Sequence, residues 1–159
     1  MLVFKNILFT LVVPGTVTVV IPYLLLTPGD HRVPVDLGVL RYAGLLPIVF
    51  GASLYGWCLW HFTFSGRGTP LPIDPARALV VQGPYRFVRN PMYLAVLAVL
   101  VGEVLLFEAP VLITYTAIWF ALVIAFVLIY EEPALRHQFG DAYRRYCRTV
   151  PRWIPWKGM

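Results

Sequence analysis

The sequence has few charged residues. Only 13% of its 159 residues are Asp, Glu, Lys or Arg, whereas 59% are hydrophobic, and a soluble domain carries about 25% charged residues. The charges are also clustered, and they leave four long apolar segments between them. This distribution excludes an ordinary soluble domain and indicates an all-α integral membrane protein with a single domain.

Cysteine is scarce too, and the motifs of several common site types are absent. Cys58 lies in an apolar segment and Cys147 in a basic tail, so they are expected at different depths and no disulfide is expected. No Cys/His cluster supports a zinc site, and we find no Walker-type lysine and no nucleic-acid-binding motif. The net charge of +5 is therefore interpreted as a sign of topology and of contact with anionic lipid.

Each of the four apolar segments is long enough, or nearly so, for a transmembrane helix, which needs about 20 residues. Pro14 and Pro22 predict kinks in the first segment, whose length favours an uncleaved helix over a signal peptide. In the second segment, small residues for close helix packing are supplied by Gly44, Gly51, Ala52, Ser53 and Gly56. The predicted transmembrane helices are Val3–Leu26, Leu40–Phe64, Pro91–Phe107 and Val111–Tyr130.

The polar segments indicate the topology. Ser65–Asn90 is expected to be largely irregular and to end at Asn90, a suitable N-cap for the third helix. The tail after the fourth helix predicts an amphipathic segment on the membrane surface, broken near Gly140 and Asp141. With four crossings, the N-terminus, this loop and the tail share one face, which holds eleven of the thirteen Lys and Arg. The positive-inside rule then predicts that both termini are cytoplasmic.

This topology brings two polar groups to one end of the hairpin formed by the third and fourth helices. The first group, at the start of the third helix, contains basic, polar and aromatic side chains: Tyr85, Arg86, Arg89, Asn90 and Tyr93. The second group is Glu131 with Glu132, followed by the arginines and tyrosines of the tail. One interpretation is structural ion pairing, for example of Arg89 with Glu131. The other is a ligand that carries both charge signs, for which S-adenosylmethionine and NADPH are both suitable.

The motifs at this end resemble those of one superfamily of enzymes. They read GPYRFVRNPMY at 83–93, EE at 131–132, FGDAYRRY at 139–146 and VPRWIP at 150–155. They are similar to the motifs of the isoprenylcysteine carboxyl methyltransferase and phospholipid methyltransferase superfamily. The resemblance covers roughly residues 66–155, and the first two helices match only as generic spans. It implies a membrane methyltransferase that uses S-adenosylmethionine, with two anchoring helices at 1–64 and a cofactor-binding core at 65–159.

The resemblance also implies roles for single residues. Arg144 and Arg145 match the substrate side and would orient the acceptor, and Glu132 would serve as the base for an amine acceptor. Many members have histidine where this chain has Asn90, which cannot titrate. The cofactor would lie between the last two helices and the tail, bound by Tyr85, Arg89, Asn90, Pro91, Tyr93, Glu131 and Tyr143.

The acceptor is expected to be lipidic or prenylated, because nearly the whole chain is embedded in the membrane. Carboxylate O-methylation is favoured, since a carboxylate needs orientation and no base. A sterol- or steroid-type reductase that uses NADPH, and a non-enzymatic membrane scaffold, are the alternatives. The oligomeric state is open. The role of Glu103 is also open: its side chain either snorkels to the far interface or has a polar role inside the bundle.

Overall fold

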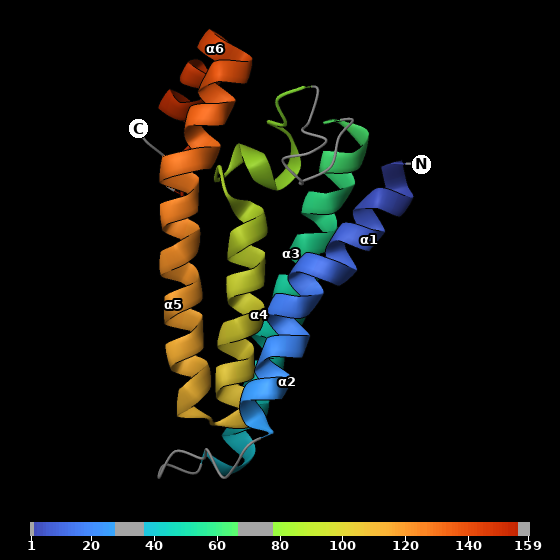
Figure 1. The fold of residues 1–159 in the computed structure, drawn as a ribbon, viewed down its shortest axis with the longest axis vertical. Coiled ribbons are helices and arrows are strands. Elements are labelled where there is room, and N and C mark those ends of the chain that lie inside the picture. Colours follow the sequence, from blue (N-terminus) through green and yellow to red (C-terminus); the bar gives the residue numbers. More distant parts are fainter. Residues whose placement is uncertain (1, 28–36, 67–77, 156–159) are drawn as a thin grey trace.

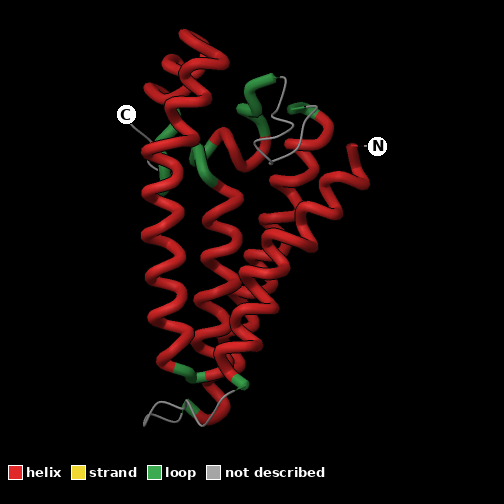
Figure 2. Tube along the Cα trace, viewed as in Figure 1, coloured by secondary structure: helices red, strands yellow, loops and turns green. Residues whose placement is uncertain are grey.

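Two antiparallel helices in the second half of the chain, α4 (Pro91–Phe107) and α5 (Pro110–Phe126), carry the candidate site at one end. The computed structural model describes residues 2–27, 37–66 and 78–155. These residues form helices and turns without a strand (Figure 2). Figure 1 shows the N-terminus, the segment before α4 and the C-terminal helix at one end of the bundle, with the α4–α5 turn at the other. The all-α fold expected from the sequence is confirmed.

The apolar helices lie close to their predicted positions. Three helical segments, Val3–Leu26, Gly38–Phe64 and Pro110–Thr149, are long and apolar enough to cross a membrane, and α4 is a shorter apolar helix of 17 residues. The second segment begins at Gly38 rather than at the predicted Leu40. The predicted loops at 27–30 and 66–75 fall largely outside the described residues. The other elements are α1 (Leu2–Gly15), η1 (Thr16–Val20), α2 (Ile21–Leu26), η2 (Gly38–Gly44), α3 (Leu45–Phe64), η3 (Gly83–Arg86), η4 (Val127–Glu131) and α6 (Glu132–Thr149).

The first helical segment changes its winding between its two prolines. α1, the π-helical turn η1 and α2 follow one another without a loop. Pro22 has no N–H to donate to the carbonyl four residues earlier, and its ring crowds that carbonyl. The wider turn at Thr16–Val20 accommodates this conflict. The irregularity that Pro14 and Pro22 predict therefore lies between them.

α3 and α4 form the closest helix pair. A Cβ atom on Gly44 would meet the carbonyl oxygen of Gly102, and a Cβ atom on Gly51 would meet the carbonyl oxygen of Ala95. The backbones can approach so closely only because these residues lack side chains. Of the small residues singled out in the sequence, Gly44 and Gly51 therefore lie in the contact that fixes α4, whereas a Cβ atom on Gly56 would meet open space.

The fourth segment continues beyond its predicted end. α5 passes through the π-helical turn η4 into α6 without a loop. Its apolar part, up to Tyr130, is about 30 Å long at 1.5 Å per residue, the thickness of the hydrocarbon layer. Glu131 and α6 therefore lie beyond the membrane-spanning part. Gly140, with φ 52° and ψ −123°, interrupts α6 where a break was predicted, and Figure 1 shows the chain turning back within α6.

The outer surface of the helices is apolar. Phe4, Leu46 and Ile129 are 71%, 74% and 78% exposed. A soluble protein of this size would bury such side chains, whereas a bilayer solvates them. The surface therefore agrees with an integral membrane protein.

Candidate active site

The segment before α4 is fixed to the C-terminal part of the chain. The Tyr146 hydroxyl of α6 donates a hydrogen bond to the buried carbonyl oxygen of Tyr85 at 2.6 Å. The backbone N–H of Arg89 donates to the carbonyl oxygen of Pro151 at 2.8 Å. Residues about 60 positions apart in the sequence are thus brought into one cluster, as the predicted topology requires.

Asn90 joins the same contact through its side chain. It occupies the N-cap position of α4, as predicted, but makes no side-chain capping bond. Its amide instead donates to the carbonyl oxygen of Arg152 at 3.3 Å. Asn90 is 8% exposed, and the following Pro91 is fully buried. Both residues therefore fix the start of α4 against the tail.

Glu132 gathers the arginines of the site. It is 4% exposed, and its carboxylate accepts hydrogen bonds from Arg152 at 2.7 and 3.0 Å, from Arg89 at 3.1 Å and from Arg136 at 3.4 Å. The ion pair of Arg89 with Glu131, considered from the sequence, is replaced by a pair of Arg89 with Glu132. We call Glu132 and these three arginines the arginine cluster.

The charges in the arginine cluster determine the protonation of Glu132. Burial alone would raise its pKa, but the hydrogen bond from Arg152 and the charges of Arg89 and Arg136 outweigh burial, so the pKa of Glu132 is lowered. The same hydrogen bond raises the pKa of Arg152. Both oxygens of Glu132 are engaged and the group is held charged, which makes it a poor base. The geometry therefore favours a positioning role for Glu132 over the predicted catalytic one.

The neighbouring Glu131 has a different environment. Its Oε2 accepts a hydrogen bond from the Tyr93 hydroxyl at 2.8 Å. Burial raises the pKa of Glu131, and the hydrogen bond from Tyr93 opposes this in part. The Trp153 ring lies 6.5 Å from the Tyr93 ring and 5.4 Å from the Phe120 ring. A carboxylate beside aromatic rings is a suitable place for a cation.

Two side chains of α6 border the arginine cluster. Arg89 Nη1 donates to Cys147 Sγ at 2.8 Å, and Tyr143, which is 2% exposed, interacts electrostatically with Cys147, Glu132 and Arg89. In the described part of the chain, the buried Nε of Arg89 has no hydrogen-bond partner. The structure thus places the predicted residue Tyr143 at the arginine cluster. One N–H donor of Arg89 has no acceptor among the described residues.

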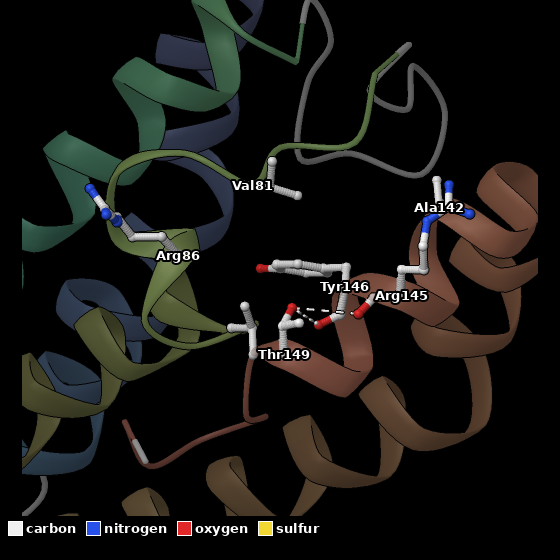
Figure 3. Close-up of a pocket in the computed structure, with 7 residues that line it drawn as sticks. Val81, Arg86, Ala142, Arg145, Tyr146 and Thr149 are labelled. Carbon is white, nitrogen blue, oxygen red and sulfur yellow. Dashed lines mark hydrogen bonds between the residues drawn. The ribbon is translucent and has the colours of Figure 1, made fainter. Parts of the chain in front are cut away.

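The two arginines predicted on the acceptor side lie outside the arginine cluster. Arg144 is exposed and pairs with Asp141 at 3.5 Å. Figure 3 shows the Tyr146 ring in the middle of a neighbouring groove, with Arg145 and Arg86 on opposite sides. The groove measures about 350 Å³ and is lined by Val81, Arg86, Ala142, Arg145, Tyr146, Thr149 and Val150.

The part of the chain that builds most of this arrangement matches a known family. Residues 40–142, well over half of the chain, match the family described as phospholipid methyltransferase. The chain belongs to the phospholipid methyltransferase family. This places it in the superfamily of integral membrane methyltransferases that its motifs resemble. No curated protein and no solved structure matches the chain.

The match to the phospholipid methyltransferase family and the site geometry overlap only in part. The match ends at Ala142, so it includes the start of α4 and both glutamates but not the last residues of the site. Cys147, Arg152 and Trp153 were not predicted as site residues. The signal for the last two was their position in the VPRWIP motif, where a basic and an aromatic residue stand between prolines.

The charges of this site fit a ligand of both signs. Three guanidinium groups surround one carboxylate, and Arg89 has a spare donor, so the arginine cluster has an excess of positive charge for a second anion. Glu131, beside aromatic rings, supplies the place for a cation. These two places suit the carboxylate of S-adenosylmethionine and its positively charged ammonium and sulfonium groups.

Proposed function

We propose that this protein is a membrane-embedded methyltransferase that uses S-adenosylmethionine and methylates a carboxylate of a lipidic or prenylated acceptor. One observation carries the proposal. A positively charged arginine cluster and a carboxylate beside aromatic rings occupy the same end of the α4–α5 hairpin, in a chain of the phospholipid methyltransferase family.

The residues of the site divide the binding of this cofactor between them. When bound, S-adenosylmethionine would supply a methyl group on its sulfonium for in-line attack by the acceptor, with the neutral thioether as the leaving group. Glu131, oriented by Tyr93, binds the positive end, and Arg89 binds the carboxylate. Glu132 positions the arginines, while the buried Tyr85, Asn90, Pro91 and Tyr143 hold the start of α4 against the tail.

The acceptor follows from the absence of a free base in the arginine cluster. An amine acceptor must lose a proton before it attacks, and Glu132 is engaged by three arginines. A carboxylate acceptor is already anionic, and needs only to be attracted and oriented. Arg145 in the groove and Arg144 beside it supply positive charge for this, at the end of the bundle that holds the cofactor site.

The reaction can be tested on membranes that contain the full chain. Incubation with S-adenosylmethionine radiolabelled in its methyl group is expected to label the lipid fraction or a prenylated protein. Mild alkali should release the label as methanol, because methyl esters hydrolyse and N-methyl groups do not. Label that is stable to alkali would indicate that the acceptor is an amine and not a carboxylate. Absence of label together with oxidation of NADPH would favour the reductase, and failure to bind either cofactor would favour a scaffold.

The binding residues can be tested on the purified protein. Glu131→Gln and Arg89→Ala are each expected to weaken binding of S-adenosylmethionine at least about tenfold, the loss of one charge-assisted hydrogen bond. Glu108→Gln, at the far end of α4, and Arg148→Ala, on the exposed face of α6, are matched controls that should bind as the wild type does. Wild-type affinity in both test variants would overturn the assignment of the site.

A further inference from the structure

A buried carboxylate in α4 has no part in the site described above. Glu103 is 9% exposed, and its Oε2 has no hydrogen-bond partner among residues 2–27, 37–66 and 78–155. It follows Tyr93 by ten positions, which is about 15 Å along the helix axis. Glu103 therefore lies at another level of the bundle, towards the α4–α5 turn.

A second buried polar group lies at the same level on α5. Thr116 is 9% exposed, and its Oγ1 likewise has no partner in the described part of the chain. Glu103 precedes the end of α4 by four residues and Thr116 follows the start of α5 by six, so each lies within about 10 Å of the turn between them. Two neighbouring helices thus bury an unsatisfied oxygen each.

The first helical segment contributes to the same region. Tyr115, next to Thr116, interacts electrostatically with Glu103, and its hydroxyl donates to the carbonyl oxygen of Val17 at 2.8 Å. Val17 belongs to the π-helical turn η1, and such turns frequently occur at functional sites. The first segment packs less closely on the hairpin than α3 does.

The chemistry of these groups defines what can bind. An unsatisfied oxygen in an apolar setting is costly to leave without a donor, and ionisable side chains inside membrane segments commonly mark functional sites. The lysines and arginines of α1, η1, α2, η2, α4 and α5 are Lys5, at the opposite end of the first segment, and Arg41 of η2, whose guanidinium donates to the Tyr42 hydroxyl at 3.1 Å. A ligand that is cationic, donates several N–H groups and carries hydrocarbon tails would satisfy both oxygens from the lipid phase.

We propose that Glu103 and Thr116 form a second, intramembrane binding site for the primary ammonium group of a lipid. The ammonium donates one hydrogen bond to Glu103 Oε2 and another to Thr116 Oγ1, and its charge neutralises the carboxylate. The group bound here is not the methyl acceptor, because it lies about 15 Å along α4 from Tyr93. The site does not depend on the proposed function.

The test measures lipid binding to the purified full chain. Native mass spectrometry in detergent compares the retention of phosphatidylethanolamine, phosphatidylcholine and phosphatidylglycerol with identical acyl chains. Phosphatidylethanolamine should be retained about tenfold more tightly than the other two, because phosphatidylcholine has no N–H donor and phosphatidylglycerol has no cation. Glu103→Gln and Thr116→Val should each reduce this preference. Soluble ethanolamine should compete only weakly if the acyl chains contribute, and as well as the lipid if the ammonium suffices; either result supports an ammonium site.

The control is Thr114→Val. Thr114 lies on the exposed side of α5, and its hydroxyl donates only to the carbonyl oxygen of Pro110 in its own helix, so this variant should keep the wild-type preference. If phosphatidylethanolamine binds only at the active site, Glu103→Gln and Thr116→Val will leave the preference for this lipid unchanged. That result would overturn the proposal. Equal retention of the three lipids by the wild-type protein would also overturn it, and would leave water as the partner of both oxygens.

Discussion

Glu131 and Glu132 are adjacent residues with different physical roles, and neutralising each should have a different effect. Glu132→Gln leaves Arg89 and Arg152 without their shared counter-charge in a buried setting. We expect a loss in the free energy of unfolding on the order of 3 kcal/mol, as for other broken buried ion pairs. Glu131→Gln keeps an oxygen for the Tyr93 hydroxyl and should cost less than about 1 kcal/mol. Thermal unfolding in detergent, followed by circular dichroism, measures both.

Cofactor affinity provides the contrasting measurement for this pair. Glu131→Gln should lose affinity for S-adenosylmethionine with its unfolding temperature nearly unchanged. Equal drops in unfolding temperature for the two variants would contradict the separate roles, because Glu131 would then also be structural.

The pH dependence of stability should also trace to Glu132. Its pKa in the folded protein is lowered below the ordinary value of 4.5. Its stabilising contribution is therefore fully present above that value and is lost as the pH falls from it through the lowered pKa. The pKa of Glu131 is raised, so Glu131 changes the stability in the opposite direction as the pH falls. Both proteins that are compared must therefore retain Glu131. Wild type should lose more unfolding temperature between about pH 5 and about pH 3 than Glu132→Gln does. Parallel curves for the two proteins would contradict this account.

The sequence identified the participating residues of the site better than their pairing. Arg89, Tyr93 and both glutamates can be named from their motifs, but the ion pair considered for Arg89 was with Glu131, whereas the structure pairs Arg89 with Glu132. Neighbouring residues on a helix point about 100° apart, and the π-helical turn η4, which ends at Glu131, shifts that direction again. No sequence period reports such a turn, so the partner of each glutamate could only be seen in three dimensions.

At the scale of helices, close packing of α3 on α4 should tolerate no added methyl group. Gly51→Ala would place its Cβ against the Ala95 carbonyl oxygen, and overpacking of this kind costs about 1 to 3 kcal/mol. Gly56, in the same helix, has open space where its Cβ would be. Gly56→Ala should therefore be neutral or stabilising by up to about 1 kcal/mol. The two variants are compared by their unfolding temperatures in detergent. An equal change in both would show that α3–α4 packing is not the cause of the destabilisation.

The helix boundaries were predictable where a residue enforces them. Pro91 and Pro110 stand at the start of α4 and α5, because proline fits the first turn of a helix. The junction of α5 with α6 was not predictable, because the change from apolar to charged residues at Glu131 marks the end of the hydrocarbon layer and not the end of the helix. A change in solvent and a break in the backbone give the same signal in a sequence.

At the scale of the whole molecule, the polar groups separate towards the two ends of the bundle. The arginine cluster and the groove lie at the end with the N-terminus and α6 (Figure 1). At the opposite end, Glu108 closes α4 in a left-handed conformation and accepts a hydrogen bond from the backbone N–H of Leu37 at 3.1 Å. The structure therefore has the two-sided arrangement from which the sequence predicts a cytoplasmic, arginine-rich face.

That orientation is itself a prediction that can be measured. Eleven of the thirteen Lys and Arg belong to the N-terminus, the 65–90 segment and the tail, so the positive-inside rule places these parts in the cytoplasm. An epitope tag after Met159 should be cleaved by protease in inside-out vesicles and protected in sealed right-side-out vesicles. A tag inserted between Gly29 and Asp30 should show the reverse. Equal protection of both tags would mean that one of the three predicted helices between them does not cross the membrane. Exchanged protection would place the arginine cluster outside, away from the cytoplasmic pool of S-adenosylmethionine that the proposed reaction requires.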